Sequence, residues 1–182
     1  MALMSIIGCT GFEREIVKLL AEDEMIDKLL IVDGSMSSEF VLELERSGLK
    51  PELLFPETLP RDLKKSKGFN VLVTLQDMNA YKSLQHFKKE AYERIKFYGL
   101  VSNGVLMFYG SCEGIFEDAL VDFRNSGFFL ELLSSEKGEY LKGIDQCSGG
   151  IRKDKVHSPE ILEKYKGCYN KLRNLVLSSH VN

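Results

Sequence analysis

Short apolar runs recur along the chain up to residue 133 and predict the strands of a sheet. Aliphatic, β-branched and aromatic residues dominate these runs, which lie at residues 3–8, 29–32, 70–75, 105–109 and 128–133. Runs of this length without strict polar alternation are typical of parallel strands that are buried on both faces. We therefore expect a sheet that is covered on both sides.

Between these runs, apolar residues repeat every three or four positions, which is the spacing of one helical face. Such stripes are formed by Phe12, Ile16, Leu19 and Leu20, and by Tyr81, Leu84, Phe87, Ala91, Ile95 and Tyr98. Ser37 and Gly48 are suitable cap and stop residues for a helix over residues 39–46. Ser158 and Pro159 predict the start of a last helix. Its apolar stripe consists of Ile161, Tyr165, Cys168, Leu172 and Leu175.

Alternating strands and helices predict βαβ units with right-handed crossovers. We therefore expect a single-domain, three-layer, Rossmann-like α/β fold with a mainly parallel sheet and the C-terminal helix packed on it. A length of 182 residues with 44% hydrophobic content suits one core. Residues 134–157 are rich in glycine and charge, so we expect a mobile loop region there.

Composition and charge narrow the class of protein. A formal net charge of −3 and a pI near 5.7 argue against nucleic-acid binding, which relies on an excess of clustered Lys and Arg. No apolar run is long enough to cross a bilayer, and the N-terminus lacks the pattern of a signal peptide. We therefore expect a cytoplasmic protein without membrane partners. Its 4 cysteines are too few for a disulfide scaffold and are expected to be thiols, thiolates or metal ligands.

Two cysteines follow predicted strands directly. Cys9 comes after the run 3–8, and Cys112 comes after the run 105–109. Ligands of parallel α/β sheets bind at the carboxyl ends of the strands, so both thiols are candidates for a site. Each turn leads toward a predicted helix, whose N-terminus favours the thiolate. The glycines that we expect to bind a cofactor in these turns are Gly8, Gly11, Gly110 and Gly114.

A third thiol allows a metal site to be proposed. Cys147 lies in the predicted loop and, like Cys9 and Cys112, has a glycine two residues later. Three thiolates suit zinc or an iron–sulfur cluster and leave one position open for a further ligand. The alternative is that these cysteines are small buried residues in tight turns. Cys168 differs from them because its place on the last helical stripe predicts core packing.

Cys112 also allows an enzymatic interpretation, as an alternative to its role as a metal ligand. The sequence Gly110-Ser111-Cys112-Glu113-Gly114 after a strand has the form of a nucleophile elbow, with cysteine in the serine position. This pattern indicates a cysteine-nucleophile hydrolase or an amidotransferase-like enzyme. Such chemistry needs a histidine as base. His157 is the best partner, because His86 lies on a predicted helix and His180 near the C-terminal end.

Several short motifs resemble those of a known family. They are Gly8-Cys9 followed by Glu15-Ile16, the stretch Pro56-Glu57-Thr58-Leu59, and the turn Tyr109-Gly110-Ser111-Cys112. Together they resemble, over residues 4–140, an uncharacterised prokaryotic domain-of-unknown-function family. Its members are often encoded beside corrinoid-dependent methyltransferases in methanogenic archaea. The resemblance implies a part in one-carbon or corrinoid metabolism, with corrinoid or methyltransferase proteins as partners.

The chain departs from the pattern of that family at two places. The family has a His shortly before the Pro-Glu pair, where this chain reads Leu54-Phe55. It also has an Asp-Cys pair near residue 128, where this chain reads Gly127-Phe128-Phe129. If the family binds a metal through those residues, this chain has lost the site or uses a replacement such as Cys147. The resemblance therefore implies the fold and the importance of Cys9 and Cys112 more than an activity.

Overall fold

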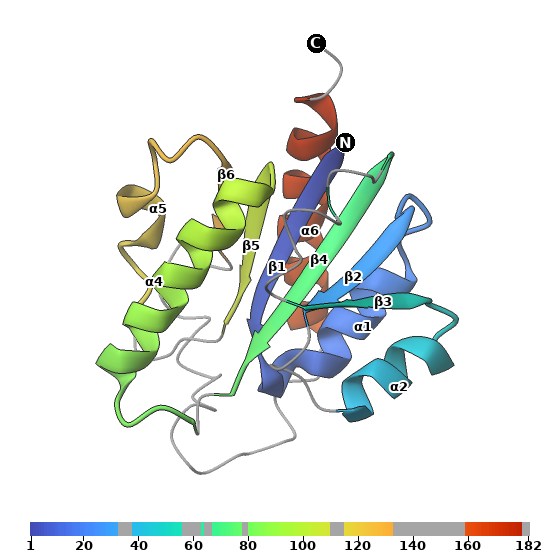
Figure 1. Cartoon of the computed structure of the whole chain (residues 1–182), viewed down its shortest axis with the longest axis horizontal. Coiled ribbons are helices and arrows are strands. Elements are labelled where there is room, and N and C mark those ends of the chain that lie inside the picture. Colours follow the sequence, from blue (N-terminus) through green and yellow to red (C-terminus); the bar gives the residue numbers. More distant parts are fainter. Residues whose placement is uncertain are drawn as a thin grey trace.

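The computed structural model describes residues 1–32, 38–55, 63, 67–77, 80–109, 115–132 and 159–179, the first three of the last range by their backbone only. Its strands are β1 (Ala2–Cys9), β2 (Lys28–Val32), β3 (Pro51–Leu54), β4 (Phe69–Gln76), β5 (Gly104–Phe108) and β6 (Phe129–Leu132). They form one six-stranded sheet in the order β3-β2-β4-β1-β5-β6 (Figure 1). Every neighbouring pair is parallel.

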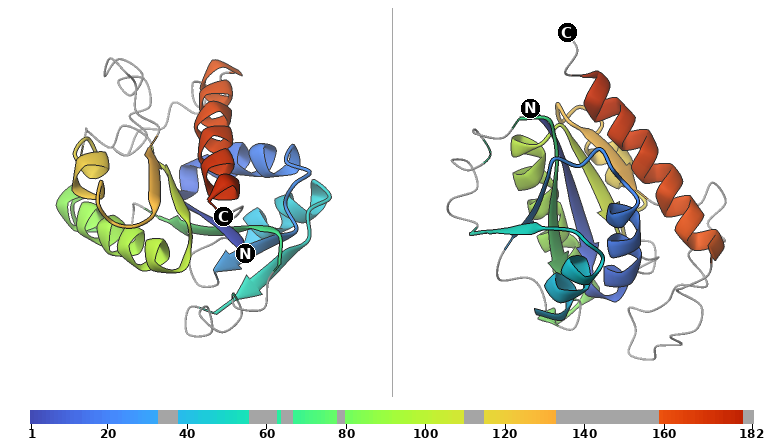
Figure 2. Two further views of the ribbon diagram at one scale, coloured as in Figure 1. Left: turned by 90° about the horizontal axis from the view of Figure 1, so that it is seen from above. Right: turned by 90° about the vertical axis from the view of Figure 1, so that its right-hand side faces the viewer.

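Helices cover both faces of this sheet, which makes the three layers that the sequence predicts (Figure 2). The helical elements are the 3-10 turn η1 (Thr10–Phe12), α1 (Glu13–Ala21), α2 (Ser38–Arg46), α4 (Leu84–Val101), α5 (Ala119–Asp122) and α6 (Pro159–Ser178). Helices α1, α2 and α6 lie on one face, and α4 and α5 lie on the other. The predicted packing of the C-terminal helix on the sheet is therefore confirmed.

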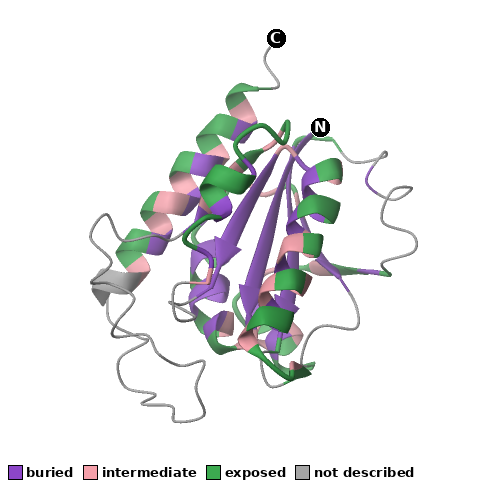
Figure 3. Cartoon of the chain, turned by 90° about the vertical axis from the view of Figure 1, so that its left-hand side faces the viewer, coloured by how far each residue is buried: buried purple, intermediate pink, exposed green. Residues whose placement is uncertain are grey.

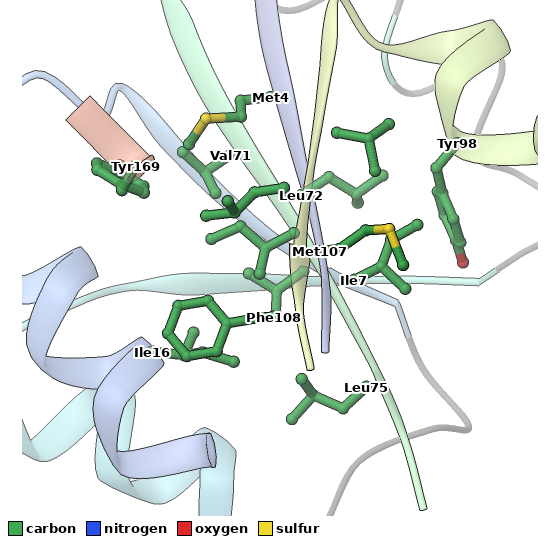
Figure 4. Close-up of a cluster of buried hydrophobic side chains, with 14 of the residues drawn as sticks. Met4, Ile7, Ile16, Val71, Leu72, Leu75, Tyr98, Met107, Phe108 and Tyr169 are labelled. Carbon is green, nitrogen blue, oxygen red and sulfur yellow. The ribbon is translucent and has the colours of Figure 1, made fainter. Parts of the chain in front are cut away.

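The core lies along the central strands, whose residues are almost all buried (Figure 3). Side chains alternate between the two faces along each strand. Figure 4 shows Phe108, Ile16 and Tyr169 on one side of the central strands, and Met107 and Tyr98 on the other. We call the first side the α1/α6 face and the second the α4 face. Phe108 stacks on Tyr165 of α6, with ring centroids 3.9 Å apart.

Helix α6 buries a stripe that shares Tyr165 and Leu172 with the predicted one and is shifted by one residue at two other positions. Its buried side chains are Tyr165, Tyr169, Leu172 and Val176. Cys168 is half-buried and Leu175 is 37% exposed, so the prediction for Leu175 is wrong. Tyr169 is buried in place of Cys168 because its hydroxyl donates to Asp23 Oδ2 at 2.6 Å. Arg173 Nη1 lies 3.0 Å from Asp23 Oδ1. This buried polar group fixes the rotation of the helix.

Most predicted elements are present, with two differences. The edge strand β3 was not anticipated, because Pro51–Leu54 is too short to give a pattern. The helix expected directly after the Cys112 turn is also different: residues 115–118 form a turn, and α5 has only 4 residues. Within the described ranges, no helix has the length and apolar character needed to span a bilayer.

Candidate functional site

The connections of the sheet reverse direction between two central strands. From β1 the chain passes through α1 to β2 and β3, which lie on one side of β1 in the sheet. From β4 it passes through α4, on the opposite face, to β5 and β6 on the other side. The carboxyl ends of β1 and β4 therefore form a topological switch point, where open α/β sheets bind their ligands.

Cys9 and Gln76 are the last residues of these two strands and are register partners. Partners in a parallel pair point to the same face of the sheet. Gly8 shows which face this is, since a Cβ added to Gly8 would point toward Ile16 of α1, 3.2 Å from its Cδ1. The neighbouring side chains of Cys9 and Gln76 therefore lie on the α4 face. Cys9 lies at the predicted carboxyl edge of the sheet. Its side chain, however, is on the face opposite α1, the helix whose N-terminus was expected to favour the thiolate.

A hydrogen-bonded group covers Cys9 on this face. Tyr109 follows β5, and its hydroxyl donates to Gln76 Oε1. Gln76 Nε2 in turn donates to the hydroxyl of Tyr81 at 3.0 Å. Because β1 lies between β4 and β5, the contact between Tyr109 and Gln76 passes over the end of β1. This arrangement agrees with the low exposure of Cys9, 9%.

Aromatic rings hold the Tyr109 hydroxyl in place. Phe87 of α4 meets the Tyr109 ring edge-on, with centroids 5.5 Å apart, and Phe116 stacks on it at 4.9 Å. Phe87 also contacts Tyr81 edge-on at 5.3 Å. Ser83 caps the start of α4 by accepting from the backbone N–H of His86. The cap and the rings position the first turn of α4 over the carboxyl edge of the sheet.

The same face carries a partly buried arginine. Arg94 of α4 donates from Nη1 to Thr74 Oγ1 at 2.8 Å. Thr74 is fully buried and lies two residues before Gln76 in β4. Together with Cys9 and Tyr109, these residues combine a soft sulfur donor, neutral hydrogen-bonding groups and a cation. Sequence analysis did not single out Gln76, Thr74 or Arg94, because their convergence depends on the placement of β4 beside β1.

Several predicted site residues can be located. Cys9 lies at the carboxyl end of β1 as expected, but it precedes the short turn η1 and makes no side-chain cap to it. Gly8 has a packing role, since an added Cβ would lie 3.1 to 3.2 Å from Leu75, Ile16 and Phe108. Gly11 is exposed within η1. The predicted residues Cys112, Cys147, His157, Gly110 and Gly114 lie outside the described residues.

The other described cysteine does not share this environment. Cys168 of α6 is half-buried against the core on the opposite face. Burial raises the pKa of its thiol above the ordinary value, and the charge of Glu131 raises it further. Among the residues that the structure describes, no three His, Cys, Asp or Glu side chains are grouped to hold a metal ion. A metal at the switch point would need ligands from the undescribed part of the chain.

Comparison with models of protein families gives no match, and comparison with curated proteins gives none either. Among solved structures, the chain is similar to a de novo designed protein of P-loop NTPase fold that was solved by solution NMR. The similarity has a TM-score of 0.47 and 17% sequence identity, and it covers 100% of this chain and 99% of the designed one.

Proposed function

We propose that this protein is a cofactor- or metal-binding accessory protein whose ligand binds at the switch point, with Cys9 as a ligating residue. The single observation that carries the proposal is the pairing of Cys9 with Gln76 at the carboxyl ends of β1 and β4. These two strands leave the sheet toward opposite faces, which opens a crevice between their loops. A thiol in this position is in reach of a ligand once the covering hydrogen bond between Tyr109 and Gln76 opens.

The metal in this proposal is zinc or an iron–sulfur cluster, held by Cys9, Cys112 and Cys147. Thiolates are the protein ligands that these soft centres prefer. Three residues of chain span at most about 11 Å, and Cys112 follows Tyr109 by that number, so it is within reach of the same edge. The family resemblance makes a corrinoid, or a corrinoid-dependent methyltransferase, the first partner to test.

Metal analysis of protein prepared without oxygen, chelator or histidine tag tests this proposal. An iron–sulfur cluster gives visible absorption, whereas zinc is colourless and requires elemental analysis. We expect Cys9→Ser and Cys112→Ser to lose the metal and Cys168→Ser to keep it. The Cys168 variant is the matched control, because its thiol lies on the opposite face. A metal-free wild-type protein, or equal loss from all three variants, would overturn the metal assignment.

The alternative function is a cysteine-nucleophile enzyme that uses Cys112 with His157. The short α5 weighs against it, since a nucleophile elbow leads directly from a strand into a helix. Iodoacetamide labelling with peptide mapping separates the two proposals. Rapid alkylation of Cys112 at a pH below the usual thiol pKa of about 8.5, in metal-free protein, would favour the enzyme.

A further inference from the structure

Arg94 has a charge that its surroundings do not balance. Within the described part of the chain, its guanidinium has the hydroxyl of Thr74 as its contact and no carboxylate within ion-pair distance. Among the described arginines, Arg173 of α6 is also partly buried, and it pairs with Asp23 at 3.0 Å. A guanidinium has five N–H donors, and one neutral hydroxyl uses one of them. Arg94 is only partly buried, and none of its nitrogen atoms is among the fully buried polar atoms that lack a partner, so its other donors are open to an anionic ligand.

A second buried group on the same face also lacks a partner. Ser5 of β1 is fully buried, and its hydroxyl makes no hydrogen bond among the described residues. Ser5 is an odd-numbered residue of β1 like Cys9, so its side chain points to the α4 face. In the register of β1 and β4, Ser5 lies two residues before Ile7, the partner of Thr74. An unsatisfied hydroxyl on β1 and the cation that α4 brings to Thr74 of the neighbouring strand β4 therefore lie on one face of the sheet.

We infer that Arg94 binds the anionic group of the ligand, a phosphate or a carboxylate. The planar fork of a guanidinium matches the oxygens of both groups and can donate two parallel hydrogen bonds to either. Thr74 fixes one edge of the fork, which leaves the other donors for the ligand. The inference deepens the proposed function and rests on it for the position of the ligand, because Thr74 lies two residues from Gln76 at the switch point.

Thermal unfolding in the presence of inorganic phosphate tests the inference. The variants are Arg94→Gln, Arg94→Lys and the control Arg14→Gln, which removes an arginine of α1 whose side chain is 68% exposed. Sodium chloride at matched ionic strength corrects for general salt effects. We expect phosphate at about one hundred times its dissociation constant to raise the Tm of the wild type and of Arg14→Gln by roughly 5 to 10 °C.

The two Arg94 variants separate charge from geometry. We expect no rise for Arg94→Gln, and at least about tenfold weaker binding for Arg94→Lys, which keeps the charge but loses the fork. Parallel titrations with acetate show whether the preferred group is a carboxylate. Equal rises in the wild type and Arg94→Gln, or no rise in the wild type with either anion, would overturn the inference. If Arg94→Gln does not fold, titration of the Arg94 side-chain Nε–Hε resonance in wild-type protein decides between the same outcomes.

Failure of this inference is distinguishable from failure of the proposed function. Metal content depends on Cys9 and Cys112 in the proposal, whereas the phosphate response depends on Arg94. Loss of the metal in Cys9→Ser without any anion response would leave the metal proposal standing and remove the role of Arg94. An anion response that Arg94→Gln abolishes, in a protein that never carries metal, would leave an anion site and remove the metal.

Discussion

The two faces of the sheet are built from different chemistry. On the α1/α6 face, the central strands β1, β4 and β5 contribute apolar side chains and glycine only: Ala2, Met4, Ile6, Gly8, Phe69, Val71, Val73, Leu75, Gly104, Leu106 and Phe108. On the α4 face, the same strands and Tyr109 contribute all of the polar groups: Ser5, Cys9, Asn70, Thr74, Gln76 and Tyr109. Helices cover both faces.

This difference separates the side chains that mainly stabilise the fold from the polar side chains of the proposed site. Burial of apolar surface is the main favourable term in folding, and the central strands contribute nothing else to the α1/α6 face. Buried polar groups add little net stability and are costly when unsatisfied, so proteins tend to keep them where they serve a site. The polar groups of the α4 face extend to the switch point at Cys9 and Gln76. We therefore expect substitutions on the two faces to affect different measurements.

The largest loss of stability is expected for Phe108→Ala on the α1/α6 face. Its ring stacks on Tyr165 at 3.9 Å and meets Phe12 edge-on at 5.8 Å, so truncation leaves a cavity beneath α6. The free energy of unfolding should fall by about 3 to 5 kcal/mol. Urea denaturation followed by circular dichroism measures it. A loss below about 1 kcal/mol would mean that α6 does not pack as described.

A smaller loss, with a pH signature, is expected for Tyr169→Phe. Its hydroxyl donates to Asp23, and removal of that bond to a carboxylate should cost about 1.5 to 3 kcal/mol. Burial raises the pKa of Tyr169 above 10.0, and the bond to Asp23 raises it further. The folded protein therefore keeps this proton at a pH where the unfolded chain loses it, so the stabilisation is complete below pH 10.0 and declines as the pH rises above it. Urea unfolding between pH 8 and about 11 should show a shallower decline for Tyr169→Phe than for the wild type.

On the α4 face, Tyr109→Phe should change reactivity more than stability. The variant removes the hydrogen bond to Gln76 that covers Cys9 and should cost about 1 kcal/mol. Alkylation of Cys9 by iodoacetamide, followed by peptide mapping, should become at least about fivefold faster, since a loss of 1 kcal/mol favours opening by that factor. Cys168 is the internal control, because it lies on the opposite face. An equal rate change for both thiols would indicate general loosening instead of local exposure.

The smallest effect is expected for Leu175→Ala on α6. Leu175 is 37% exposed, so its truncation should change the free energy of unfolding by no more than about 0.5 kcal/mol. The neighbouring Val176→Ala is the matched comparison, because Val176 is fully buried and should cost about 2 kcal/mol. The same urea denaturation measures both. Equal losses would contradict the rotation of α6 that Tyr169 and Asp23 set.

Local pattern was sufficient to predict most of the elements. The runs at residues 3–8, 29–32 and 70–75 agree with β1, β2 and β4 to within one residue at each end. Strands buried on both faces produce continuous apolar runs that are visible in sequence. The position of Cys9 at the end of β1 was predictable for the same reason. The four-residue strand β3 was not, because its pairing with β2 defines it and its own composition does not.

Only the tertiary structure decided which residues meet at the switch point. Gln76 lies far from Cys9 in the chain and becomes its register partner because β4 inserts between β2 and β1. Arg94 has the sequence signature of a solvated charge on an amphipathic helix, and only the packing of α4 brings it to Thr74. The stripe of α6 was also decided in this way, by a buried contact to Asp23. Hydrophobic periodicity reports burial along one element, whereas strand order and helix rotation depend on contacts between elements distant in sequence.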